Sequence, residues 1–120
     1  MRGLLIPVDG VPAVVGVAGG EGARFLRSLR SLVGAEQVER FRVTSRWEFW
    51  VDEDGQAAGK VVNEPATRVA HDFGVPFSFL GTVVVTGVDD NGEGRRSLSP
   101  GQADAIIRCV AQARNLPGGR

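Results

Sequence analysis

The stretch Leu80–Val88 reads L-G-T-V-V-V-T-G-V and is the longest β-branched run in the chain. In an extended strand, Val83 and Val85 point to one face. Leu80 and Val84 point to the opposite face. Apolar residues on both faces are typical of a strand that is covered on both sides. We therefore predict a central strand here, with the other elements beside it or packed against it.

Four more strands are predicted on the N-terminal side of this stretch from short apolar runs and from alternation of apolar with polar residues. They cover Gly3–Val8, Val11–Val17, Val38–Val43 and Trp47–Val51. Asp9-Gly10 joins the first two and is a strong hairpin signal. Pro12 then has to lie at the start of the second strand or on a sheet edge. In the fourth strand, Trp47 and Trp50 point to opposite faces, which requires cover on both sides or leaves one ring partly exposed.

Three helices complete the pattern. Ala23–Val33 has one apolar stripe, and Gly34 follows as a stop. Asn63 can cap a helix that runs to about Phe73. Ser99-Pro100-Gly101-Gln102 is a capping box before a helix that reaches about Arg114. The order ββ-α-ββ-α-β-α predicts one α+β domain over residues 1–116, with a largely antiparallel sheet of about five strands and a frayed tail at 117–120.

Composition excludes several classes of protein. The 120 residues hold 14 basic and 14 acidic side chains, so the chain has neither the strong positive charge typical of nucleic-acid binders nor a strong negative charge. A single cysteine excludes an internal disulfide and favours a reducing compartment. No stretch is long and apolar enough to cross a membrane, and no secretory leader opens the sequence. We therefore expect a cytoplasmic protein with no membrane contact.

The residues that most often carry chemistry are sparse. His71 is the only histidine, and it is expected on a helix surface. Cys109 lies at the edge of an apolar helical stripe, as a small core residue would. Two acidic turns lack the spacing of a calcium loop. We assign no catalytic residue, no metal ligand and no cofactor, and we lean away from an enzyme.

Two weak binding patterns remain. Arg40, Arg42, Arg46 and Trp50 can share one face of a strand pair, and arginines beside an aromatic platform bind single-stranded nucleic acid in several folds. The alternative is that the arginine stems simply pack over Trp50.

A glycine-rich connection precedes the first helix, where phosphate-binding loops occur. Its candidate anion-binding residues are Gly19, Gly20, Gly22 and Arg24. The Lys-Ser/Thr that such loops carry is absent here, and a plain flexible connection explains the glycines equally well.

Several motifs, in order and spacing, resemble a family known only as a domain of unknown function, number 3846. They are the opening G-L-L-I-P-V, V-D-E-D-G at Val51–Gly55, Asn63 with Ala66-Thr67, L-G-T-V-V-V-T-G at Leu80–Gly87, and S-L-S at Ser97–Ser99. The resemblance covers most of the chain and implies an accessory protein of phages, plasmids or other mobile elements. The resemblance implies no particular activity. Asn63 and Thr67 are candidate family site residues, although a helix cap with a close-packed start explains them as well.

The sequence has clear signals for its strands and helices but no cluster of reactive side chains. This combination favours an interaction domain. We expect a protein partner or self-association, so a homo-oligomer is possible. Nucleic-acid or nucleotide binding through the Arg/Trp face or the glycine loop is the less favoured alternative.

Overall fold

The computed structural model describes residues 1–19, 22–89 and 95–115. Its elements, in chain order, are β1 (Arg2–Ile6), β2 (Ala13–Gly16), α1 (Ala23–Val33), β3 (Val38–Arg42), β4 (Trp47–Asp52), α2 (Glu64–Asp72), β5 (Val83–Val88), β6 (Arg95–Arg96) and α3 (Pro100–Asn115). This order confirms the predicted α+β class and adds the short β6. The predicted tail at 117–120 lies outside the described residues.

The sheet is antiparallel throughout and has the order β2-β1-β5-β4-β3, with β6 paired to β5. All six residues of β5 are buried, and the strand pairs with β1 on one side and β4 on the other. The predicted central strand is therefore confirmed. It begins at Val83 rather than Leu80, because Gly81 turns the chain with a φ of 74° and Leu80 forms only an isolated bridge with Val62.

The N-terminal hairpin is confirmed, but its connection is longer than a tight Asp-Gly turn. β1 ends at Ile6 and β2 begins at Ala13. Pro7 and Pro12 bound this connection, and neither has a backbone N–H for the ladder between the strands. Pro12 therefore precedes β2, which is an edge strand of the sheet.

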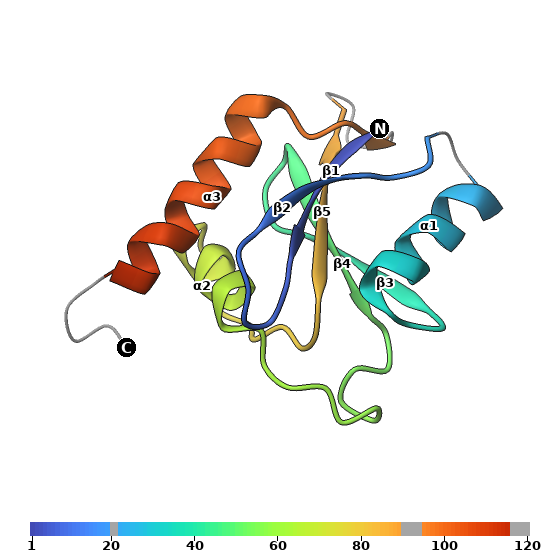
Figure 1. Cartoon of the computed structure of the whole chain (residues 1–120), viewed down its shortest axis with the longest axis horizontal. Helices are drawn as coiled ribbons and strands as arrows, with labels where there is room; N and C mark the ends of the chain where they lie inside the picture. The colour runs from blue at the N-terminus through green and yellow to red at the C-terminus, as the bar shows by residue number, and fades with distance from the viewer. Residues whose placement is uncertain (20–21, 90–94, 116–120) are drawn as a thin grey trace.

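Helices cover both faces of the sheet (Figure 1). One face packs against α2 and α3 around a core that includes Phe49, Val83 and Val85. The other packs against α1 around a smaller core that includes Trp50 and Val84. This three-layer arrangement explains the two tryptophans of β4: Trp47 is buried on the first face and Trp50 on the second.

The helix ends follow their local signals. Gly34 ends α1 in the left-handed conformation, and its N–H donates to Arg30 O at 2.8 Å. At the start of α3, the Gln102 N–H donates to Ser99 Oγ at 3.1 Å and the Ser99 N–H donates to Gln102 Oε1 at 2.9 Å. The capping box is therefore confirmed. Within the described part of the chain, no helix is long and apolar enough to cross a membrane.

Candidate interaction surfaces

The predicted arginine–tryptophan face exists, but its aromatic ring is buried. Arg40 lies directly opposite Trp50 in the β3–β4 ladder, so both side chains share a face. That face is the one under α1, and Trp50 is only 3% exposed. Its ring meets Phe25 edge-on at 5.4 Å, and its Nε1–H donates to Thr86 Oγ1 at 2.9 Å. Trp50 therefore offers no platform on which a base could stack.

Two of the predicted arginines form ion pairs with a buried carboxylate. Glu48 is 1% exposed, and its Oε1 lies 3.6 Å from Arg40 Nε and 3.7 Å from Arg42 Nε. A carboxylate taken out of water needs such cations, because an unbalanced buried charge is strongly destabilising. Arg46 lies elsewhere, beside Arg96 in a polar pocket of about 190 Å³. No local sequence pattern indicates that β4 carries a buried acid.

Asn63 and Thr67 are structural residues in this fold. Asn63 Oδ1 accepts the Ala66 N–H at 2.9 Å and caps α2. Its Nδ2 donates to Ile6 O and to Gly81 O, both at 2.9 Å. Thr67 Oγ1 accepts the Phe79 N–H at 3.0 Å. The described hydrogen bonds engage every polar atom of the Asn63 side chain, which fits the capping interpretation of these positions.

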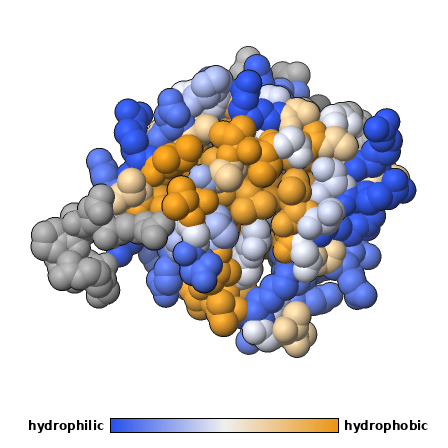
Figure 2. All heavy atoms as spheres, viewed as in Figure 1, coloured by the Kyte–Doolittle hydropathy of each residue, from blue (hydrophilic) through white to orange (hydrophobic). Residues whose placement is uncertain are grey.

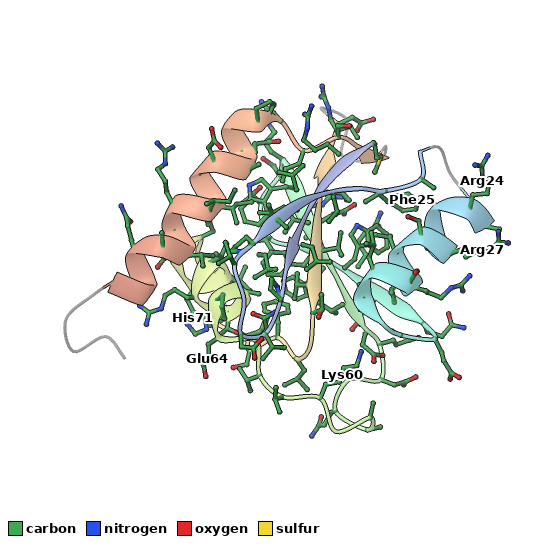
Figure 3. All side chains as sticks on the ribbon, in the orientation of Figure 1. Arg24, Phe25, Arg27, Lys60, Glu64 and His71 are labelled. Carbon is green, nitrogen blue, oxygen red and sulfur yellow. The ribbon has the colours of Figure 1, made fainter. Side chains whose placement is uncertain are left out.

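The glycine-rich connection is described only at its two ends. Gly19 and Gly22 are exposed, Gly22 has a φ of 85°, and Gly20 lies outside the described residues. Arg24 and Arg27 project outward from the first turns of α1 (Figure 3). Anion binding at this loop stays a prediction.

The remaining chemistry-bearing residues form no reactive cluster. His71 is exposed on α2. The Cys109 thiol is half-buried and donates to Asp72 Oδ2 at 2.8 Å. Burial and the Asp72 carboxylate raise the pKa of Cys109 to about 12, so the thiol stays protonated at neutral pH. Among the residues placed by the structure, no group of three or more His, Cys, Asp or Glu side chains could hold a metal ion.

The open outer edge of β2 is a structural feature that the sequence interpretation missed. Val17 and Met1 exchange both backbone hydrogen bonds, with N···O distances of 2.8 and 2.6 Å. Hydrogen-bonded pairs recur at every second residue of an antiparallel ladder, so the backbone N–H and C=O of Val15 also point toward β1. The N–H and C=O groups of Val14 and Gly16 therefore point away from the sheet. The sequence signal that could have indicated this open edge is the absence of charged residues from Val11 to Gly19.

A second missed feature is a pocket of about 260 Å³ at the opposite end of the strand order, beside β3. Its lining comes from β3, from β4 and the turn that follows, and from the segment before β5. Segments so far apart in sequence share no local motif, so nothing in the sequence brings them together before the fold is known.

Comparisons with known proteins give a family and no activity. A family model described as a domain of unknown function, DUF3846, matches residues 1–111. No curated protein and no solved structure matches the chain.

Proposed function

This chain belongs to the DUF3846 family of domains of unknown function, and we propose that it is a non-enzymatic interaction domain that self-associates through the edge strand β2. The observation that carries the proposal is the open, uncharged β2 edge. A second copy of the same strand can bind its outward backbone groups and the exposed Val14 side chain.

The two sheet edges differ in how they are protected. β3 reads V-E-R-F-R, and its Glu39, Arg40 and Arg42 are all exposed. Charged side chains on an edge strand discourage pairing with another chain. β2 reads A-V-V-G and carries no charge, while Val14 is 56% exposed and nearby Val11 is 72% exposed. Protection at only one edge favours β2 as the edge that pairs.

The surface around β2 is apolar over a wider area than the strand alone. Figure 2 shows hydrophobic residues across the centre of the face on which Figure 1 places β2 in front of the other strands. Burying an apolar patch contributes about 25 cal/mol per Å² of surface removed from water. Strand pairing at β2 would add backbone hydrogen bonds to this contribution.

A twofold axis gives this pairing a definite register. If two β2 strands pair antiparallel with Val15 opposite Val15, then Val14 of one copy meets Gly16 of the other. These are the residues whose N–H and C=O groups point outward, so four new backbone hydrogen bonds form. The two sheets become one continuous sheet, and the interface is closed and self-complementary.

Light scattering coupled to size-exclusion chromatography tests the proposal. We expect the native chain to pass from monomer to dimer across about 1–500 μM, the range in which weak interfaces dissociate. Val14→Lys puts a charge on the edge and should shift this transition to at least about tenfold higher concentration.

Val61→Lys is the matched control, because Val61 is 62% exposed and lies outside the sheet. It should dimerise like the native chain. A second variant, Val14→Pro, removes an outward N–H that β1 does not use and should also weaken dimerisation. A native chain that stays monomeric over the whole range would overturn the proposal, as would equal dimerisation of Val14→Lys and Val61→Lys.

The cellular setting forms part of the same proposal. A single cysteine supports action in a reducing compartment such as the cytoplasm. The family resemblance supports an accessory role in a phage or another mobile element.

A further inference from the structure

The pocket beside β3 combines an apolar interior with an acidic rim. Its volume is about 260 Å³, below the roughly 300–1,000 Å³ of pockets that hold a drug-sized ligand or cofactor. It can therefore accommodate one side chain or a small molecule. The lining residues are Glu39, Phe41, Val51, Asp52, Glu53, Gly55, Gln56, Phe77, Ser78, Phe79 and Leu80.

Three phenylalanines form the aromatic part of the lining. The Phe41 ring meets the Phe79 ring edge-on at 5.2 Å between centroids and the Phe77 ring edge-on at 5.8 Å. Phe79 is 6% exposed and belongs to the core, whereas Phe77 is 56% exposed. Phe77 is therefore a solvent-exposed aromatic wall beside the partly buried Phe41.

Every charged residue of the lining is acidic. Asp52 is already engaged, because its Oδ2 lies 2.8 Å from Lys60 Nζ and the same ammonium donates to Gly34 O at 2.9 Å. The two others, Glu39 and Glu53, are exposed. Among the residues that the structure describes, no lysine, arginine or histidine lines the pocket. The pocket therefore presents two carboxylates beside aromatic rings, and its described lining holds no cation to balance them.

We propose that this pocket binds the guanidinium group of an arginine side chain on a partner protein. Guanidinium is planar, stacks on aromatic rings and donates hydrogen bonds in a fork that suits carboxylates. A lysine ammonium is more strongly hydrated and has no planar face, so it fits this lining less well. Anionic ligands such as phosphates are disfavoured by the two carboxylates. The site is independent of the β2 edge, which lies at the other end of the strand order.

Titration of the native chain with N-acetyl-arginine amide, followed by NMR of the backbone amides, tests the proposal. One side chain bound at an open site should give a Kd on the order of 1–10 mM, and binding should weaken with added salt. The shifted amides should cluster at 39–41, 51–56 and 77–80. The neutral isostere N-acetyl-citrulline amide should bind at least about tenfold more weakly, because it lacks the charge that the carboxylates attract.

Two variants locate the site. Glu39→Gln combined with Glu53→Gln removes the rim charge, and Phe77→Ala removes the exposed wall; each should weaken arginine binding at least about threefold. Glu36→Gln is the matched control, since Glu36 is exposed but does not line the pocket. Val14→Lys should leave arginine binding unchanged, which separates this site from the dimer edge.

Two outcomes would overturn the assignment. Equal binding of arginine and citrulline amides would show that charge does not select the ligand. Shifts that survive both pocket variants would place binding elsewhere on the molecule.

Discussion

Asn63 is fully buried and holds three segments together through its side chain. Its Oδ1 caps α2, while its Nδ2 satisfies the carbonyls of Ile6 and Gly81. Capping alone was predictable, because Asn before Glu-Pro is a local signal. The two donated bonds were not, because they depend on where β1 ends in space.

Replacing Asn63 should therefore cost more than losing a helix cap. Asn63→Ala removes the cap and leaves two buried carbonyls without this donor, so we expect a loss of about 3 kcal/mol or more in urea unfolding. Ser99→Ala, which loses only an exposed cap, should cost about 1 kcal/mol.

Asn63→Asp keeps the cap acceptor but turns a carboxylate oxygen toward two carbonyl oxygens. It should be strongly destabilised at pH 7 and recover part of that loss near pH 4, where the carboxyl can bind a proton. A loss for Asn63→Asp no larger than that for Ser99→Ala would contradict this account.

Cys109 should be slow to react in the folded chain. Its pKa is raised from 9.0 to about 12, chiefly by burial and then by Asp72, so the thiolate fraction at pH 8 falls about 1,000-fold. Alkylation with iodoacetamide should be far slower in the native chain than in urea, and Asp72→Asn should accelerate it. Equal native and unfolded rates would refute the assignment.

The same shift has a defined effect on stability. A thiol whose pKa is raised by folding stabilises the native state below its unfolded pKa of 9.0, and this contribution is lost as the pH rises toward 12. Cys109→Ser should therefore lose less stability than the native chain between pH 9 and pH 11.

At the scale of elements, features that depend on residues within one segment were predicted reliably. Features that depend on packing against another element were not. Ala23–Val33 was predicted with its observed bounds, because its apolar stripe and Gly34 lie within the segment itself. The connection through Asp9-Gly10 is longer than predicted, because Pro7 and Pro12 cannot donate to the ladder and the strands stop short of them. The burial of Trp50 could not be predicted, because it depends on α1 docking across β4.

One contact between elements should be sensitive to pH. The hydrogen bond from Lys60 lowers the pKa of Asp52 below its ordinary value of 3.8, helped by the Asp54 N–H and opposed by burial. A lowered pKa gives stability that is present above about pH 4 and lost as the pH falls further. Lys60→Met should therefore cost about 1 kcal/mol at pH 7, and the difference should shrink below pH 4.

Asp52→Asn is the companion variant for this contact. It removes the charge but keeps the bond from Lys60 to Gly34 O, so it should lose less stability than Lys60→Met and approach the native chain at low pH. Differences that stay constant from pH 7 to pH 3 would contradict the assigned role of the ion pair.

At the scale of the whole molecule, the fold class and five of the six described strands followed from the sequence, but the strand order and the candidate surfaces did not. The alternation in β3 and β4 correctly placed Arg40 and Trp50 on one face. It could not show that the face is closed by α1 or that Glu48 lies buried beside the arginines. The pocket beside β3 and the open edge of β2 can be recognised only once the strand order β2-β1-β5-β4-β3 is known.

That order also constrains how the chain can fold as it is synthesised. β1 lies inside the sheet, and the strand that covers its second side is β5, which begins only at Val83. During synthesis, the side of β1 that pairs with β5 therefore has no partner until the chain has been translated past Val83. During that interval β1 is as available to a chaperone or to another nascent chain as β2 is in the finished molecule.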